Sequence, residues 1–293
     1  MELKVSLFVP PHNPGTVLLS RLADAVRERS AGRLSLRIFH SEALGPTAAQ
    51  YELARSGAAD IAYMIHSATP GRFPLTELAH LPPVSSAAAG TAALQALLPD
   101  YLQQEHAGVK VLFLAANTPM AIHSTRGITD LKGLRIGHTG RVVAATIKAL
   151  GAVPVTVMPL TIRDALASGA IDATSMTYEA ALVIRLAEAV RCSFELNANT
   201  ITFGLVMNAA RYHALAPELR RVVDEVLGAG AGRELATMLD AAAAEGRRYM
   251  REAGVPAVAP RDELASILES VSNSFLAEPE AKAVFQKMKK ELV

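Results

Sequence analysis

The chain has 293 residues, 51% of them hydrophobic, so it can bury a large core and is expected to divide into two lobes. Its 29 Lys and Arg residues almost balance its 28 Asp and Glu residues, which leaves no overall field to attract a nucleic acid or an acidic membrane. We therefore expect no nucleic-acid partner. The single cysteine, Cys192, excludes an internal disulfide and any multi-cysteine metal site.

The sequence has no window that reaches the roughly 18 to 20 uninterrupted apolar residues of a membrane span. Its first residues, MELKVSLFVPP, begin directly with an alternating strand pattern and lack the charged, apolar and small-residue order of a signal peptide. Two expectations remain open on this ground. The protein is cytoplasmic, or it is exported and its signal peptide has been removed.

Strand and helix patterns alternate from the N-terminus onward. Apolar residues alternate over 3–9, which predicts a strand, and recur at helical spacing over 16–32, where Gly32 ends the helix. A strand over 33–39, a helix over 46–57 and a strand over 58–65 follow. This order predicts a parallel sheet covered by helices.

The same order recurs in the middle of the chain, with strands expected at 134–140, 153–159 and 170–176 and helices between them. SGAADIAYM at 56–64 and SGAIDATSM at 168–176 share Ser, Gly, Ala, Asp and Met at matched offsets. Gly57 and Gly169 would each provide a left-handed helix cap, and Asp60 and Asp172 would each begin the next strand. Two similar lobes are the expected result.

The region after the second lobe is strongly helical. Residues 210–253 are rich in Ala and predict one long helix, or a broken pair, which would act as a strut across both lobes. Residues 278–293 predict a closing helix with charges on its outer face.

Motifs for catalysis are missing from the sequence. It contains no GxSxG, no phosphate loop ending in Gly-Lys-Ser, no HExxH and no GxGxxG after the first strand. The eight histidines are scattered without the spacing of metal ligands. We therefore expect a binding protein without cofactor or metal, and not an enzyme.

Four segments carry a resemblance to a known family. They are GRLSLRIFHSEALGPTAAQYELARSGAADIAY at 32–63, ITDLKGLRI at 128–136, ALGAVPVTVMPLTIRDALASGAIDA at 149–173 and LVMNAARYHALAPELRRVVDE at 205–225. In content and order these segments resemble the solute-binding proteins of tripartite ATP-independent periplasmic (TRAP) transporters, the DctP family. The similarity covers nearly the whole chain.

The resemblance implies an α/β protein with a two-lobed periplasmic-binding-protein fold, type II-like, in which a hinge and a long helix connect the lobes. Residues 1–118 and 205–245 would form lobe I, residues 119–204 and 246–293 would form lobe II, and the ligand would lie in the cleft between them. It also implies a periplasmic monomer, with its signal peptide removed, that captures a small organic acid and delivers it to a two-subunit TRAP membrane permease. Ligand contacts to both lobes would favour the closed state.

One position departs from the family pattern. In the family, the Lys-Ile of the second motif is normally followed by an arginine that holds the ligand carboxylate through two hydrogen bonds. Here LRIGHTGR places Gly137 at that position. Three interpretations stay open: His138 or Arg141 binds the anion at the start of the next helix, the solute is neutral or mainly apolar, or the protein has drifted and binds no transported solute.

Other residues are expected to line the cleft, because ligands of open α/β sheets bind at the carboxyl ends of strands. Met64 and Met176 stand at matching strand ends and would form adaptable walls, although core packing explains them equally well. Tyr178 and Phe203 could stack on a planar ligand. The remaining candidates follow strands of the first lobe: His12, Asn13, Ser67 and Asn117.

Two alternatives come from other functional classes. A cytoplasmic effector-sensing domain can use a bilobed fold, but such domains usually follow a DNA-binding segment. An α/β enzyme acting on a small acid would need a polar catalytic pair in the cleft, and the sequence shows none.

Overall fold

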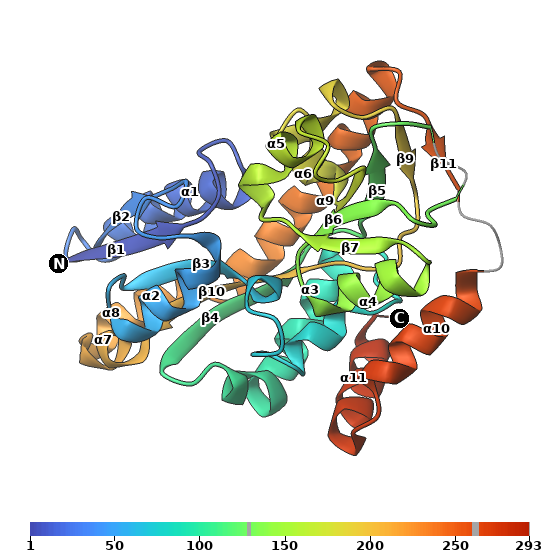
Figure 1. The fold of residues 1–293 in the computed structure, drawn as a ribbon. Coiled ribbons are helices and arrows are strands. Elements are labelled where there is room, and N and C mark those ends of the chain that lie inside the picture. Colours follow the sequence, from blue (N-terminus) through green and yellow to red (C-terminus); the bar gives the residue numbers. More distant parts are fainter. Residues whose placement is uncertain (128–129, 260–263, 293) are drawn as a thin grey trace.

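The computed structural model describes residues 1–127, 130–259 and 264–292 and contains two β-sheets, each covered by helices (Figure 1). The first two residues of the ITDLKGLRI segment, 128 and 129, lie outside the described residues. The sheets form two lobes that lie beside each other, and α9 (Ala229–Glu252) runs across both.

The first lobe is built on a five-stranded sheet in the order β2-β1-β3-β10-β4. β1 pairs in parallel with β2 and β3, whereas β10 is antiparallel to β3 and β4. The strands are β1 (Glu2–Leu7), β2 (Ser35–Phe39), β3 (Ile61–Ile65), β4 (Val109–Ala116) and β10 (Thr202–Asn208). The helices of this lobe are α1 (Pro14–Arg29), α2 (Gln50–Ser56), α3 (Ala87–Leu97), α7 (Ala209–Ala214) and α8 (Pro217–Leu227).

The second lobe is built on a six-stranded sheet in the order β11-β9-β5-β8-β6-β7. β6 pairs in parallel with β7 and β8, and β5 is antiparallel to β8 and β9. The strands are β5 (Ala121–Ser124), β6 (Arg135–His138), β7 (Val153–Thr156), β8 (Ala173–Met176), β9 (Cys192–Phe194) and β11 (Ala257–Val258). The helices are α4 (Arg141–Ala149), α5 (Ile162–Ala167) and α6 (Tyr178–Val183).

The two sheets repeat one arrangement, as the matched SGAADIAYM and SGAIDATSM segments predict. Gly57 and Gly169 both have a left-handed backbone, with φ of 81° and 70°. Asp60 accepts a hydrogen bond from the backbone N–H of Lys4 at 2.7 Å, and Asp172 accepts one from the N–H of Arg135 at 2.9 Å. Each aspartate therefore ties the start of its own strand to the parallel strand beside it.

The chain passes between the lobes where β4 leads into β5 and β9 leads into β10. Gly232 of α9 approaches Phe113 and Leu114 of the first lobe, and Gly246 of the same helix approaches the Tyr178 carbonyl of the second. A Cβ atom at Gly246 would lie 2.0 Å from the Tyr178 carbonyl oxygen. The strut expected from 210–253 is α9 alone, because the earlier part of that region forms α7 and α8 of the first lobe, and glycine allows the close contact of α9 with α6.

The C-terminal region ends in α10 (Leu264–Phe275) and α11 (Pro279–Glu291). α10 packs against α4 of the second lobe, whereas α11 packs against α3 of the first. The division into residues 1–118 with 205–245 and 119–204 with 246–293 stays a prediction. In the structure, β10 begins at Thr202 and already belongs to the first sheet, and α11 near the end of the chain packs against the first lobe.

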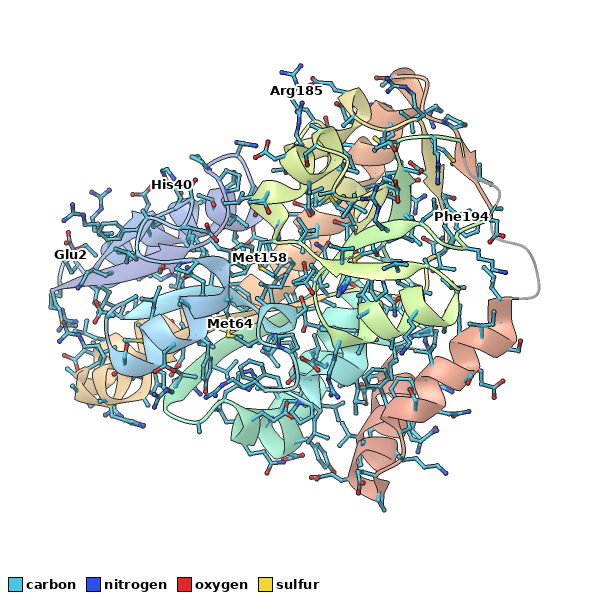
Figure 2. The ribbon with its side chains drawn as sticks, viewed as in Figure 1. Glu2, His40, Met64, Met158, Arg185 and Phe194 are labelled. Carbon is cyan, nitrogen blue, oxygen red and sulfur yellow. The ribbon has the colours of Figure 1, made fainter. Side chains whose placement is uncertain are left out.

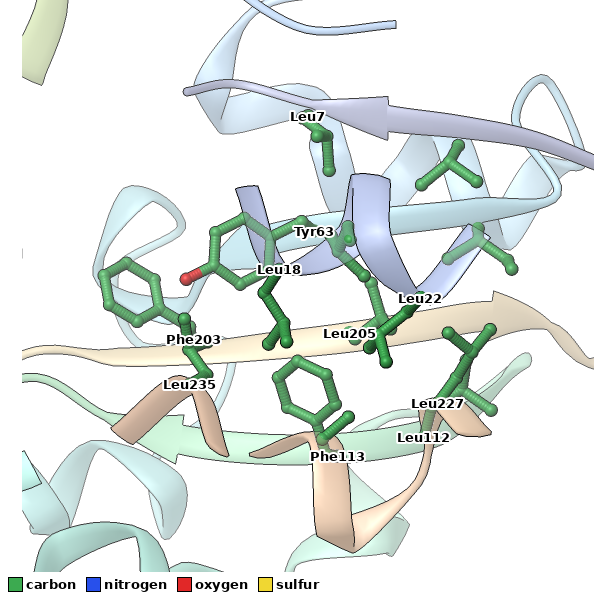
Figure 3. Packing of buried hydrophobic residues seen from close by; sticks show 14 of the residues in the cluster. Leu7, Leu18, Leu22, Tyr63, Leu112, Phe113, Phe203, Leu205, Leu227 and Leu235 are labelled. Carbon is green, nitrogen blue, oxygen red and sulfur yellow. The ribbon is translucent and has the colours of Figure 1, made fainter. Parts of the chain in front are cut away.

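The core of the first lobe lies between its sheet and helices α1, α8 and α9. Leu18 and Leu22 of α1 project onto the sheet, where they meet Leu205 of β10, and Leu235 of α9 packs into the same cluster (Figure 3). Asn13 caps α1 by accepting a hydrogen bond from the Gly15 N–H at 2.9 Å. This cap fixes the first loop at the edge that faces the second lobe.

Candidate functional site

A small cavity of about 80 Å³ lies between the lobes. Its walls come from the loop after β1, the ends of β3 and β8, helix α6 and the segments that connect the lobes. Most of the lining is apolar. The lining residues are Phe8, Val9, Pro10, Asn13, Ile65, Asn117, Pro159, Leu160, Met176, Glu179, Ala180, Val183, Ile184, Ile201 and Phe203.

Aromatic side chains form the first-lobe side of the cavity. The ring of Phe8 stacks on that of Tyr63 with centroids 5.6 Å apart, and Tyr63 stacks on Phe203 at 5.2 Å. Figure 3 shows the rings of Tyr63 and Phe203 side by side at the edge of the core. Because the rings pack against one another and into the core, they form a fixed surface against which an apolar group can rest.

Glu179 is the one acidic side chain in the lining, and it is 2% exposed. Its Oε1 accepts a hydrogen bond from Asn13 Nδ2 at 3.0 Å. Its Oε2 accepts from Asn117 Nδ2 and from Thr177 Oγ1, both at 3.3 Å. The carboxyl group therefore connects the first lobe, a connecting segment and the second lobe.

The orientation of both amides is fixed by the backbone. Asn13 Oδ1 accepts from the Gly15 N–H, and Asn117 Oδ1 accepts from the Thr118 N–H at 2.8 Å. A flipped amide would lose that acceptor, so the nitrogen of each amide must point to Glu179. Thr177 Oγ1 accepts from the Ala180 N–H at 3.3 Å, which leaves its own hydrogen for Glu179. All three partners are therefore donors.

Burial raises the pKa of Glu179, and the hydrogen bonds from Asn117, Thr177 and Asn13 oppose that rise because they stabilise the ionised form. No lining residue of the cavity is basic. Two arginines on neighbouring elements have carboxylate partners of their own, whereas His12 contacts the backbone carbonyl of Val183. Arg163 pairs with Glu188 at 2.9 Å, and Arg247 pairs with Glu195. Within the described ranges, the buried carboxyl group of Glu179 thus has no cationic partner in the cavity lining.

Gly137 lies in β6 with its α-carbon facing the side chain of Ile171. A Cβ atom at this position would lie 2.7 Å from Ile171 Cδ1 and 3.5 Å from Thr174 Oγ1. Ile171 is buried, at 1% exposure. The space into which a side chain at position 137 would extend is therefore already filled, and glycine itself provides no side chain to bind a carboxylate.

Arg141 and His138, the two expected substitutes, are not among the lining residues. Arg141 pairs with the buried carboxylate of Glu77, and its guanidinium lies 5.1 Å from the centre of the Phe275 ring. His138 ends β6 and is buried, and its Nδ1 has no hydrogen-bond partner among the described residues. Burial lowers the pKa of His138, which favours the neutral ring over an anion-binding cation.

The other expected site residues fall in three groups. Asn13, Asn117, Met176 and Phe203 line the cavity together. Met64 is packed in the core of the first lobe (Figure 2). The remaining three lie around the cavity and not in its lining: His12 contacts the Val183 carbonyl at 3.3 Å, Ser67 packs against Gly140, and Tyr178 donates a hydrogen bond to Glu195 at 3.0 Å.

Glu179 is the functional candidate that inspection of the sequence missed. It stands in the first turn of a short helix after the Thr177 cap, where an acidic residue is common because it interacts favourably with the helix dipole. The available signal was its place, directly after the strand end at Met176 that was expected to reach the cleft. The apolar lining residues Leu160, Val183 and Ile184 resemble ordinary core positions and carry no such signal.

The described residues include no group of three or more His, Cys, Asp or Glu side chains that could hold a metal ion. Among the helices that the structure describes, none is long and apolar enough to cross a membrane. The described lining of the cavity presents one carboxyl group, two amides and an apolar wall.

Comparison with known proteins identifies the family. The model of bacterial extracellular solute-binding protein family 7, DctP, matches residues 5–278. The chain belongs to the DctP family. The family that the sequence motifs predicted is thereby confirmed.

Solved structures of TRAP solute-binding proteins share the fold of this DctP-family chain. A protein from Rhodoferax ferrireducens, in complex with copurified benzoate, is 26% identical with a TM-score of 0.93, over 100% of this chain and 97% of that one. A marine metagenome protein from an unidentified microbe, specific for aromatic acid ligands, is 23% identical with a TM-score of 0.94, over 100% and 98%. A Bordetella bronchiseptica protein with bound mandelate is 22% identical with a TM-score of 0.90, over 100% and 98%.

These comparisons confirm the two-lobed α/β fold and place the chain among TRAP solute-binding receptors. The family and its structural neighbours are transport proteins and not enzymes.

Proposed function

We propose that this protein is the periplasmic receptor of a TRAP transporter and that it holds a small, predominantly apolar organic solute in the cavity between its lobes. The observation that carries this proposal is the lining itself. Aromatic and aliphatic side chains from both lobes converge on one space, and a few polar groups lie at one side of it. Solute sites generally have this composition.

The solute is small. An apolar cavity of about 150 Å³ accommodates benzene, whereas this one measures about 80 Å³. A solute with an aromatic ring therefore requires the lobes to lie farther apart than they do in this structure, with the ring held between first-lobe residues such as Phe8 and second-lobe residues such as Leu160. Relatives bind benzoate and other aromatic acids, which supports a ring or a branched aliphatic group as the apolar part.

The solute is not held as a carboxylate in the way that the family pattern implies. Gly137 provides no side chain, Arg141 is engaged with Glu77, and the cavity wall contains a carboxyl group instead of a cation. An anion in this space would lie near Glu179 without a counter-charge, which is unfavourable at short range in a buried site. These contacts favour the interpretation in which the solute lacks a carboxylate.

Delivery to the permease follows from closure. Contacts of the solute with α6 in the second lobe and with the β1 loop in the first shift the equilibrium toward the closed form, in proportion to the energy of those contacts. A two-subunit TRAP permease in the inner membrane would then recognise the closed receptor and accept the solute.

A thermal-shift screen tests the proposal. A ligand present at about 100 times its dissociation constant adds roughly 2.7 kcal/mol to the stability of the folded state. Matched benzyl and isobutyl compounds with alcohol, amide, amine and carboxylate groups should raise the melting temperature, with the carboxylates weakest. Replacing Phe203 with Ala should reduce the shift for every compound. A purified, folded protein that responds to none of the compounds would contradict the proposal.

A further inference from the structure

We infer that Glu179 is the residue that selects the solute, and that the solute presents a protonated amine to it. This inference rests on the proposed function, because it concerns the same cavity. It adds the chemical class of the solute, which is an organic cation with an apolar body and an ammonium group as its polar end. The carboxylate Oε1 and Oε2 atoms of Glu179 would accept hydrogen bonds from the ammonium group, and the aromatic wall would hold the rest.

The first step of the argument concerns the ionisation state of Glu179. Its three partners, the Asn13 and Asn117 amides and the Thr177 hydroxyl, all donate to it. The nitrogens of the two amides can only donate, because the oxygen of each amide is turned to a backbone N–H, so both amides are suited to an ionised carboxylate, which accepts through both of its oxygens. The hydrogen bonds therefore match the ionised form.

The second step concerns the missing counter-charge. Buried carboxylates in folded proteins are normally paired with a cation or hold a metal, because an unpaired buried charge is strongly unfavourable. Glu179 is 2% exposed, and the described lining of the cavity contains no Lys, Arg or His. A cation that enters with the solute would complete the site and then leave with it.

The third step concerns the wall opposite the carboxylate. Phe8 and Phe203 line the cavity and stack with Tyr63, whose pKa is raised by burial and, to a smaller extent, by the nearby carboxyl group of Glu179. Aromatic faces attract cations through their quadrupole. The same wall that accepts the apolar body therefore also favours a positive charge near the carboxylate.

The position of Glu179 also explains how recognition would produce closure. Asn13 belongs to the first lobe, Asn117 to a connecting segment and Glu179 to α6 of the second lobe. Neutralising the carboxylate with an ammonium group removes the penalty for burying it between the lobes. The closed form thus gains stability when the cation is present.

Isothermal titration calorimetry with two matched series tests the inference. The first series is benzylamine, benzyl alcohol and benzoate, and the second is isobutylamine, isobutanol and isobutyrate. In the wild-type protein each amine should bind at least about 10-fold more tightly than its alcohol, because hydrogen bonds to charged groups are stronger than neutral ones, and the carboxylates should bind most weakly.

The decisive variant is Glu179→Gln, which keeps the size of the side chain and one acceptor oxygen while removing the charge. It should bind the amines about 10 to 100-fold more weakly and leave the affinity for the alcohols unchanged within about threefold. Glu188→Gln, a change to an exposed carboxylate outside the cavity, is the matched control and should leave the selectivity of the wild type intact.

The outcomes separate the inference from the proposed function. Tighter binding of benzoate than of benzylamine, or equal binding of amine and alcohol, overturns the role of Glu179 but leaves a solute receptor. Binding of no compound of either series overturns the proposed function and the inference with it. The comparison of amine, alcohol and carboxylate in the wild-type protein decides the inference even where Glu179→Gln does not fold.

Discussion

Arg141 of the second lobe reaches Glu77 of the first, and the two side chains form an ion pair in which Glu77 is 1% exposed and Arg141 remains partly exposed. The other oxygen of Glu77 accepts a hydrogen bond from the Gly71 N–H at 3.1 Å. The arginine that sequence patterns offered as a ligand anchor thus connects the two lobes beside the cavity. Removing Arg141 would leave the buried carboxylate of Glu77 without a counter-charge.

Replacing Arg141 with Ala should lower the free energy of unfolding by about 2 kcal/mol, because the buried carboxylate of Glu77 would lose its counter-charge. The relative affinities for amines, alcohols and carboxylates should stay the same, since Arg141 does not line the cavity. Urea unfolding and calorimetry measure the two effects. Adding Glu77→Gln should restore part of the stability, because the amide oxygen can still accept from Gly71. A loss of solute selectivity in Arg141→Ala would instead assign the arginine to the solute.

The packing of Gly137 on Ile171 predicts a coupling between these residues. Gly137→Ala should lower the stability by about 1 kcal/mol, because the added methyl group would lie 2.7 Å from Ile171 Cδ1. Ile171→Val removes that atom, so the double variant should be more stable than the sum of the single changes predicts. Chemical denaturation of the four proteins gives the coupling energy. Additive single effects would show that Ile171 does not limit the space at position 137.

Buried histidines predict loss of stability in weak acid. Burial lowers the pKa of His80 to about 3 and those of His106 and His123 to about 4, below the usual value near 6.5. The unfolded chain therefore binds more protons than the folded one between about pH 6.5 and 4, and stability falls as the pH falls through that window. Each histidine contributes about 1.4 kcal/mol per pH unit. The raised pKa values of Glu105 and Glu179 act in the opposite direction.

Urea unfolding at pH 7, 6 and 5 measures this dependence. His80→Gln should reduce the slope of the unfolding free energy against pH by an amount that corresponds to about one proton. Glutamine does not titrate, and it can still reach Thr202 Oγ1, which His80 Nε2 contacts at 2.9 Å. His213→Gln changes an exposed ring and serves as the control. A slope that is the same in His80→Gln and in the wild type would contradict the assignment.

Two glycines of α9 give a matched pair of substitutions. Gly246→Ala should destabilise the protein by about 3 kcal/mol or more, since the new methyl group would overlap the Tyr178 carbonyl oxygen at 2.0 Å. Gly230→Ala, near the exposed start of the same helix, meets only the end of the Arg233 side chain at 4.0 Å and should change the stability by less than about 1 kcal/mol in the favourable direction. Thermal unfolding compares them directly. Equal effects of the two substitutions would mean that α9 can move away from α6 with little loss of stability.

Much of the fold could be predicted because local patterns and tertiary structure agree. The alternating residues before Pro10 became β1, and the matched Gly57 and Gly169 both cap helices in the left-handed conformation. The antiparallel β10 was harder, because its pairing with β3 and β4 joins residues that are far apart in the chain. The local sequence of a strand does not indicate which distant strand it will pair with.

The site was less predictable than the fold. Asn13, Asn117 and Met176 could be placed near the cavity because each follows or ends a strand, whereas Phe203, at the start of β10, was named only as an aromatic residue able to stack on a ligand. Glu179 could not, because its importance depends on burial and on the absence of a cation in the cavity wall. Arg141 stands beside the expected position in sequence, but the ion pair with Glu77 directs it elsewhere.

The long helix α9 is seated by a glycine in each lobe, Gly232 against Phe113 and Gly246 against Tyr178. Neither contact leaves room for the helix to slide. If the lobes rotate about one another, the helix between these two fixed contacts must therefore bend. Each opening then stores elastic energy in the helix. The angle between the lobes then depends on the stiffness of the helix between Gly232 and Gly246 as well as on the solute. Residues between the two glycines, remote from the cavity, can thus tune how readily it opens.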